Sequence, residues 1–217
     1  MTEMNRILEP EYMDTPDESS EYDAMDHTEV NTAFVERLHE LGVHGNVIDL
    51  GTGPGQIAIA IAESAEDLHV LGIDAAATML TIAEKRKAAS TAAQRIEFRQ
   101  GNAKHLDLDD HSFDAVVSNT VLHHIPDPVE FLREAGRLLK PGGVLLIRDL
   151  FRPETPEDVA AIVNKHGEGQ SALSLQLFRA SLHAALTQEE LRAAALEAGL
   201  EAFKITQDSD RHMSLQK

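Results

Sequence analysis

The sequence predicts an α/β fold: a doubly wound, mostly parallel, seven-stranded sheet with helices on both faces and a reversed C-terminal hairpin strand. Three observations lead to this prediction. Short apolar runs that are typical of buried strands alternate with helical patterns of about 10 to 15 residues, as right-handed βαβ crossovers require. A glycine-rich turn, "GTGPG", follows the first run. The last two runs are separated only by "DSD", which indicates an antiparallel hairpin.

Five parallel strands are expected, each from a short apolar run bounded by turn residues. They cover residues 47–49, 70–73, 96–100, 115–118 and 144–148. Helical patterns lie between them at 56–63, 77–89 and 128–139, and an N-terminal helix is expected over 20–41 and is ended by Gly42. In "LKPGGVLLIRD", Pro141 and the two glycines after it end a helix before the fifth strand begins.

The C-terminal third departs from this alternation. Residues 155–186 have a helical pattern that is broken at "HGEGQ", and such a long excursion can form a lid. The next helix is well delimited, because Thr187 and Glu190 have the spacing of a capping box and Gly199 can end the helix. Two short strands, 203–207 and 211–216, then form the hairpin.

The charge excludes several classes of partner. There are 19 Lys and Arg against 37 Asp and Glu, so the formal net charge is -18, and nucleic acid and anionic membranes are repelled at long range. A small-molecule partner is expected instead. Cysteine is absent, which removes disulfides, thiolate metal sites and a cysteine nucleophile. The acidic start and the lack of a long apolar run favour a cytoplasmic protein, and the oligomeric state, monomer or homodimer, stays open.

The glycine turn fits a nucleotide-like ligand but not a dinucleotide fingerprint. Gly51, Gly53 and Gly55 form G-x-G-x-G, and Gln56 stands where G-x-G-x-x-G needs its last glycine. Glycine lets a strand turn sharply into a helix and lets the backbone approach a ligand closely. At the end of the second strand, Asp74 can accept hydrogen bonds from both hydroxyls of an adenosine ribose.

Taken together, the motifs resemble the class I S-adenosylmethionine-dependent methyltransferases of the small-molecule type. The segments "VIDLGTGPG", "GID", "GNA", "SFDAVVSNTVLHHI" and "LKPGGVLLIRD" occur in the order of that family. The resemblance implies transfer of a methyl group from S-adenosylmethionine to a small molecule by in-line displacement, with S-adenosylhomocysteine as product. It also implies a single domain: residues 1–42 form an arm and helix over the cofactor, 43–150 the cofactor-binding core, 152–186 an insertion or lid, and 187–217 the last helix and hairpin.

The resemblance also assigns cofactor-binding residues. Glycines of the turn would approach the methionine part, Asp49 would order the turn or meet the ammonium group, and Asp74 would hold the ribose. Asn102 stands where many relatives have Asp, and its amide oxygen can still accept from the adenine amine. The full set is Asp49, Gly51, Gly53, Asp74, Ala75, Met79, Asn102, Ala103 and Asn119, together with Tyr22 of the predicted N-terminal helix. The alternative for Tyr22 is a half-buried contact of this helix that does not touch the cofactor.

The acceptor side is less determined. His123 and His124 lie at a strand end, where either is a candidate base or positioning group, and the alternative is that they pack against the cofactor or cap a turn. Arg148 and Arg211 can bind an anionic acceptor or pair with nearby acids, namely Asp149, Asp208 and Asp210. No ligands have the spacing of a metal site, so no metal is expected.

Two other functions remain open at this stage. A nicotinamide-dependent oxidoreductase would use the same strand, glycine turn and ribose acid, although Gln56 and the terminal hairpin argue against it. A non-catalytic protein that binds S-adenosylmethionine would need no acceptor pocket. The acceptor atom, whether O, N, S or C, depends on the shape of the pocket.

Overall fold

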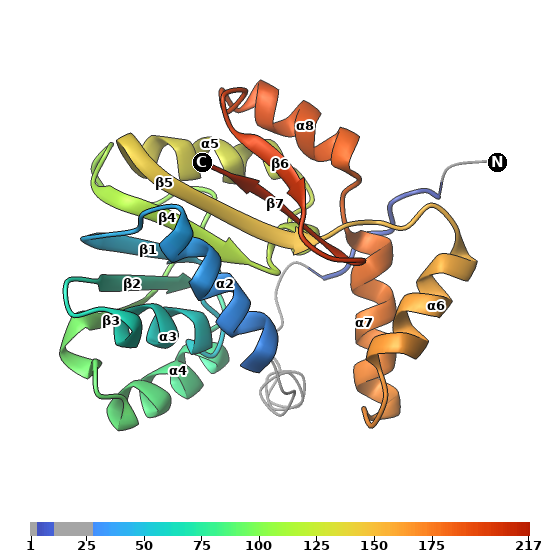
Figure 1. Ribbon diagram of the computed structural model, residues 1–217, viewed down its shortest axis with the longest axis horizontal. Coiled ribbons are helices and arrows are strands. Elements are labelled where there is room, and N and C mark those ends of the chain that lie inside the picture. Colours follow the sequence, from blue (N-terminus) through green and yellow to red (C-terminus); the bar gives the residue numbers. More distant parts are fainter. Residues whose placement is uncertain (1–3, 11–27) are drawn as a thin grey trace.

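The computed structural model describes residues 4–10 and 28–217. Its centre is a seven-stranded sheet in the order β3-β2-β1-β4-β5-β7-β6 (Figure 1). Neighbouring strands from β3 to β5 are parallel, whereas β7 runs antiparallel to β5 and to β6. The predicted fold class is therefore confirmed, including the reversed hairpin strand at the C-terminal end.

The strands follow the apolar runs closely. Their bounds are β1 (Asn46–Leu50), β2 (His69–Asp74), β3 (Ile96–Gln100), β4 (Phe113–Asn119), β5 (Leu139–Leu150), β6 (Lys204–Gln207) and β7 (His212–Gln216). The helices are α2 (Thr28–Glu40), α3 (Gln56–Ser64), α4 (Ala77–Ala89), α5 (Pro128–Leu138), α6 (Pro156–His166), α7 (Ala172–Ala184) and α8 (Gln188–Glu197). Two 3₁₀ turns, η1 (Ala93–Arg95) and η2 (Leu122–His124), precede β3 and α5.

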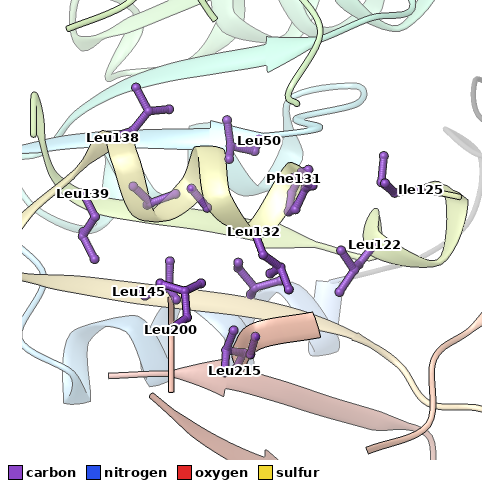
Figure 2. Close-up of a cluster of buried hydrophobic side chains, with 14 of the residues drawn as sticks. Leu50, Leu122, Ile125, Phe131, Leu132, Leu138, Leu139, Leu145, Leu200 and Leu215 are labelled. Carbon is purple, nitrogen blue, oxygen red and sulfur yellow. The ribbon is translucent and has the colours of Figure 1, made fainter. Parts of the chain in front are cut away.

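The central strands bury both of their faces because successive side chains point to opposite sides of the sheet. In β1, Ile48 packs into a cluster with α5 and α8, while its neighbour Val47 packs into a second cluster with α2 and α3. Figure 2 shows the first cluster, in which Phe131 of α5 gathers with side chains of the strands. This two-sided packing is the reason why the strands have continuous apolar runs rather than alternating ones.

One boundary differs from the prediction. The fifth strand begins at Leu139, not at residue 144, and Pro141 lies inside it. Leu139 pairs with Phe113, and the register then shifts between Phe113 and Ala115 before Val144 continues the ladder. Because proline has no N–H to donate, it is tolerated in a strand only at such an irregularity.

The N-terminal helix and the start of α8 agree with the sequence prediction where the structure describes them. The N-terminal helix is seen from Thr28 to Glu40, while residues 20–27 of its predicted range lie outside the described residues. The capping box of α8 is present, since the Thr187 hydroxyl accepts from the Glu190 N–H at 3.2 Å and the Glu190 carboxylate accepts from the Thr187 N–H at 2.8 Å.

Helices α6 and α7 stand beside one end of the sheet, as Figure 1 shows in orange. They share a small apolar cluster with Leu150 at the end of β5, in which Val159 and Leu182 are fully buried. The described part of the N-terminal arm, residues 4–10, runs along α7, where the Ile7 N–H donates to the His183 carbonyl at 3.0 Å. Within residues 4–10 and 28–217, no helix combines the length and apolar composition that crossing a membrane requires.

Candidate active site

A cavity of about 330 Å³ lies at the C-terminal ends of the parallel strands. In open α/β sheets, ligands bind at this edge where the strand order reverses, which here is between β1 and β4. All but one of the site residues predicted from the sequence line this cavity. They are Asp49, Gly51, Gly53, Asp74, Ala75, Met79, Asn102, Ala103, Asn119, His123, His124, Arg148 and Arg211. The exception, Tyr22, lies outside the described residues.

The glycine turn after β1 forms one wall of the cavity. Gly51 has a φ of 77°, and a Cβ there would lie 2.4 Å from Cγ2 of Val121, so only glycine fits at this close approach. Gly53 has a φ of 53°, but a Cβ there would have no heavy atom of the described residues within 4 Å. The turn thus packs tightly against the protein at Gly51 and is open at Gly53.

Asp49, in β1 directly before this turn, stabilises the conformation of the turn. It is 1% exposed, and its carboxylate accepts a hydrogen bond from the Thr52 hydroxyl at 2.7 Å. Burial raises the pKa of Asp49 to about 7, against the lowering by Thr52, because the charged form has lost its water. A cation in the cavity would favour the ionised form.

Asp74 joins two of the cavity's turns. Its Oδ2 accepts from the Gly53 N–H at 2.7 Å, and its Oδ1 accepts from the Ala76 N–H at 2.9 Å, just before α4. The carboxylate of β2 therefore holds the glycine turn of β1 in place. A carboxylate has about four acceptor positions and can accept from several donors at once.

The ends of β3 and β4 contribute two amides. Asn102 accepts from the Lys104 N–H at 3.0 Å, which fixes the turn after β3. Asn119 accepts from Arg148 Nε at 2.9 Å and donates to the Thr120 hydroxyl at 2.9 Å. Thr120 has a φ of 58°, a left-handed conformation that is uncommon for a β-branched residue. Such strain concentrates at ligand sites, and Thr120 lines the cavity.

Arg148 links α2 to the sheet. Besides its bond to Asn119, its Nη2 donates to the Val30 carbonyl at 2.7 Å, and its guanidinium lies 4.9 Å from the centre of the Phe34 ring. Burial lowers the pKa of Arg148 to about 10. Its side chain is therefore used largely to hold α2 against the cavity.

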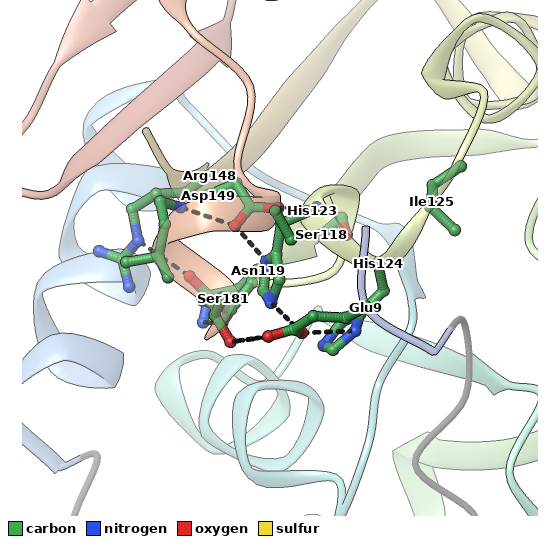
Figure 3. Close-up of polar contacts among 12 residues, drawn as sticks. Glu9, Ser118, Asn119, His123, His124, Ile125, Arg148, Asp149 and Ser181 are labelled. Carbon is green, nitrogen blue, oxygen red and sulfur yellow. Dashed lines mark hydrogen bonds and ion pairs between the residues drawn. The ribbon is translucent and has the colours of Figure 1, made fainter. Parts of the chain in front are cut away.

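His123 and Asp149 form a buried pair at the other side of the cavity (Figure 3). Nδ1 of His123 lies 2.7 Å from Asp149 Oδ1, and the same carboxylate accepts from the N–H groups of His123 at 2.8 Å and Leu150 at 2.6 Å. Burial alone would lower the pKa of His123, but the Asp149 charge outweighs it and the pKa is raised. The pair fixes the ring, so Nε2 faces away from Asp149.

Glu9 of the N-terminal arm meets both histidines. Its Oε2 lies 3.2 Å from His124 Nδ1 and 3.9 Å from His123 Nε2, and its Oε1 accepts from the Ser181 hydroxyl of α7 at 3.1 Å (Figure 3). Burial raises the pKa of Glu9 and lowers the pKa of His124 to about 3. No metal was expected from the sequence because ligand spacings were lacking, yet the fold brings these three ligand-type side chains together.

The predicted pairing of the arginines is partly wrong. Asp149 pairs with His123 rather than with Arg148, and Asp208 accepts from the Ser214 and Thr206 hydroxyls. Asp210 is held by Lys165 at 2.6 Å and by His166 at 3.0 Å, and these two hydrogen bonds lower its pKa to about 2. Arg211 is 3.9 Å from Asp210.

Several cavity residues were not found from the sequence. Ser181 lines the cavity, and Glu9 lies behind it beside His123 and His124. Glu9 and Ser181 are more than 170 positions apart in the chain, and neither lies in a recognisable motif. The α6–α7 region also contributes His166, Gly167, Gln170, Ser174, Leu175, Leu177 and Phe178. The one usable signal was the broken helical pattern at 155–186, which predicted a covering segment but not its side chains.

Comparison with known proteins agrees with this architecture. The family described as a methyltransferase domain matches residues 41–199. A demethylmenaquinone methyltransferase of Lactiplantibacillus plantarum is 35% identical over 117 residues, which are 54% of this chain and 49% of that protein. A 27-O-demethylrifamycin SV methyltransferase of Amycolatopsis mediterranei is 31% identical over 179 residues, covering 80% of this chain and 61% of that protein.

The chain spans about half the length of the curated relatives it matches. The fold recurs in the crystal structure of a SAM-dependent methyltransferase from Aquifex aeolicus, with a TM-score of 0.68, 18% identity, and coverage of 93% of this chain and 97% of that one. The glycine turn, the strand-end carboxylate and the reversed hairpin thus occur in a chain that belongs to the methyltransferase domain family.

Proposed function

We propose that this chain transfers the methyl group of S-adenosylmethionine to a small-molecule acceptor and releases S-adenosylhomocysteine. One observation carries the proposal: the glycine turn, Asp74 and the amides of Asn102 and Asn119 line one cavity in a chain of the methyltransferase domain family. In this proposal residues 43–150 hold the cofactor and residues 152–186 cover the acceptor.

The residues present fit that cofactor. The cavity has the volume typical of sites for small molecules, about 300 to 1,000 Å³. The opening at Gly53 lets the backbone of the turn approach a ligand closely, and Asp49 and Asp74 place two carboxyl groups beside a molecule that has an ammonium and a sulfonium group. Asp74 is suited to the ribose hydroxyls because its carboxylate is already oriented by two backbone N–H groups.

S-Adenosylmethionine, when bound, supplies an electrophilic methyl group that is displaced in line by a nucleophile. The protein then has to align the acceptor and exclude water, and alignment can contribute roughly 7 to 11 kcal/mol. Helices α6 and α7 and the loop between them provide apolar walls for this purpose, including Leu175 and Phe178. No covalent bond to the protein is needed.

The acceptor is proposed to lie against His123 and His124. Both line the cavity, and their ring centres are 4.1 Å apart. Nδ1 of His123 is engaged by Asp149, which leaves Nε2 for chemistry in the cavity. Such an imidazole can accept a proton from an acceptor hydroxyl or ammonium group, or it can bind a metal ion.

Calorimetry tests the cofactor assignment. Wild-type protein is titrated with S-adenosylmethionine and S-adenosylhomocysteine, beside Asp74→Asn and the matched control Asp67→Asn, which changes an exposed aspartate in the loop before β2. Losing a charged hydrogen-bond partner costs about 1.5 to 3 kcal/mol, so Asp74→Asn is expected to weaken binding roughly 10- to 100-fold. The control should bind as the wild type does.

Two outcomes would contradict the proposal. If neither compound binds at millimolar concentration, the cofactor assignment is wrong, and quenching of nicotinamide fluorescence on mixing would favour an oxidoreductase. If both bind but formation of S-adenosylhomocysteine stays at the background rate across a broad panel of acceptors, the chain is a binding protein rather than an enzyme.

A further inference from the structure

We propose that Glu9, His123 and His124 form a binding site for one divalent transition-metal ion of the Zn²⁺ or Fe²⁺ class. The site itself is argued from the side chains alone, and its use for the acceptor rests on the proposed function. These three residues, called here the Glu9 cluster, come from the N-terminal arm and from the 3₁₀ turn after β4.

The ligand atoms of the Glu9 cluster are close enough to share an ion. One atom from each residue lies within 4.8 Å of the other two, with Glu9 Oε2 at 3.2 Å from His124 Nδ1 and at 3.9 Å from His123 Nε2. Metal–nitrogen and metal–oxygen bonds of about 2.0 to 2.2 Å in a tetrahedron place neighbouring ligand atoms roughly 3.3 to 3.6 Å apart. Small side-chain movements would therefore complete the geometry.

Outer partners hold two of the three ligands in the required orientation. Asp149 accepts from the Nδ1 side of His123, which directs Nε2 at Glu9, and Ser181 donates to Oε1 of Glu9, which directs Oε2 at the histidines (Figure 3). Metal-binding histidines usually have a carboxylate or carbonyl on the other ring nitrogen, and metal-binding carboxylates are likewise hydrogen-bonded. The arrangement has both features of a built site.

Charge and burial also favour a cation. The side chains of Glu9, His123 and His124 are 11%, 4% and 16% exposed, so a carboxylate beside two imidazoles is held with little water. The Nδ1 of His124 also lies 3.3 Å from the Pro10 carbonyl, and an ion would take the place of the proton shared there. The Arg6 guanidinium opposes a cation, but it is bound to carbonyl oxygens of Ala184 and Ile125, and two carboxylates, Glu9 and Asp149, offset it.

The donor set selects the type of ion. Two imidazoles and one carboxylate suit Zn²⁺, Fe²⁺ or Co²⁺, whereas Mg²⁺ and Ca²⁺ prefer sites made of oxygen ligands. Both histidines and Ser181 line the cavity, so an ion held by the Glu9 cluster would be accessible from the cavity. An acceptor hydroxyl bound there would lose its proton more readily, and this would make it a better nucleophile for the methyl group.

Metal titration of the full chain tests the site. Protein stripped with a chelator is titrated with Zn²⁺ by calorimetry and with Co²⁺ by visible absorption, whose intensity reports the coordination number. One ion per chain is expected. Glu9→Gln and His124→Asn remove ligands and should abolish this binding, while Ser181→Ala should weaken it by about 10- to 100-fold because it removes an outer partner. The matched control is His39→Asn on the exposed side of α2, which should bind as the wild type does.

The outcomes separate this inference from the proposed function. Circular dichroism and binding of S-adenosylhomocysteine are measured on every variant, so a variant that fails to fold is recognised and Ser181→Ala then decides. Absence of a one-to-one complex in the wild type, or equal binding by folded Glu9→Gln, overturns the metal site and leaves the cofactor assignment intact. If the folded wild type does not bind S-adenosylhomocysteine, the proposed function is overturned instead.

Discussion

Two walls of one cavity were built in different ways. The wall proposed to hold the cofactor, called here the cofactor wall, consists of turns directly after β1, β2 and β3. Its side-chain hydrogen bonds join Thr52 to Asp49, three positions apart, and Gly53 to Asp74, 21 positions apart. The wall proposed to hold the acceptor, called here the acceptor wall, combines η2, α6 and α7. Residues 4–10 pack behind it through bonds such as that from Arg6 to Ala184, 178 positions apart. The first wall depends on local backbone geometry and the second on docking of separate segments. Substitutions should therefore affect the two walls differently.

The largest effect is expected at the cofactor wall, from Gly51→Ala. Its Cβ would lie 2.4 Å from Val121 Cγ2, and its φ of 77° is unfavourable for any residue with a side chain. Overpacking costs about 1 to 3 kcal/mol and the left-handed backbone about 1 to 2 kcal/mol, so the free energy of unfolding should fall by about 2 to 5 kcal/mol. Urea denaturation measures this loss.

The control for that prediction is Gly53→Ala. The backbone is also left-handed there, but a Cβ would meet nothing within 4 Å in the described part of the chain. Its cost should be limited to about 1 to 2 kcal/mol. In a Val121→Ala background the penalty of Gly51→Ala should approach this smaller value, and an unchanged penalty would contradict the steric explanation.

A pH-dependent effect is expected from Asp49→Asn. Because the pKa of Asp49 is raised to about 7, the stability linked to its protonated form is present below about pH 4 and is lost as the pH rises through about 7. The variant avoids this loss, so above neutral pH it should be more stable than the wild type by on the order of 4 kcal/mol. Near pH 4 the two should agree, and Asp67→Asn should show no such divergence in thermal unfolding. If the wild type is instead more stable than Asp49→Asn at high pH, the explanation by burial of the Asp49 carboxylate is wrong.

A substitution of Arg148 distinguishes a role in holding α2 from a role in binding the acceptor. Arg148→Met keeps most of the volume but removes the charged hydrogen bonds to Asn119 and Val30, which contribute about 1.5 to 3 kcal/mol each. It also removes the cost of burying the guanidinium charge, which offsets part of this loss. We expect faster hydrogen exchange in residues 28–40 and a loss of stability of about 2 to 4 kcal/mol. If Arg148 binds the acceptor rather than α2, exchange in this helix would stay as in the wild type and only acceptor affinity would fall.

The smallest effect on the cofactor wall is expected from Arg6→Ala. Arg6 donates to the carbonyl oxygens of Ala184, Ile125, His123 and Pro126, and thereby docks the arm beside the acceptor wall. Its removal should make residues 4–10 more accessible to protease while leaving the affinity for S-adenosylhomocysteine unchanged, because residues 4–10 line no part of the cofactor wall. Calorimetry and limited proteolysis check both halves, and a marked loss of cofactor affinity would show that the two walls are coupled.

Much of the fold could be predicted because the signals are local. Apolar runs predict strands buried on both faces, the capping box at Thr187 and Glu190 predicts the start of α8, and the "DSD" turn predicts the hairpin. The boundary of β5 was misplaced because Pro141 usually ends an element, and only pairing with Phe113 shows that the strand continues through it.

The sheet, its reversed hairpin and the wall proposed to hold the cofactor could be predicted from the sequence alone, since each depends on residues that are neighbours in the chain or on strand ends that parallel pairing brings to one edge. The contacts of the acceptor wall depend on the tertiary structure. Asp149 could be assigned to His123 rather than Arg148 only once η2 was placed beside β5. Glu9 could be assigned to the two histidines only once residues 4–10 were packed against α7. No sequence spacing encodes contacts across more than a hundred residues, because they arise from how separate elements bury their surfaces.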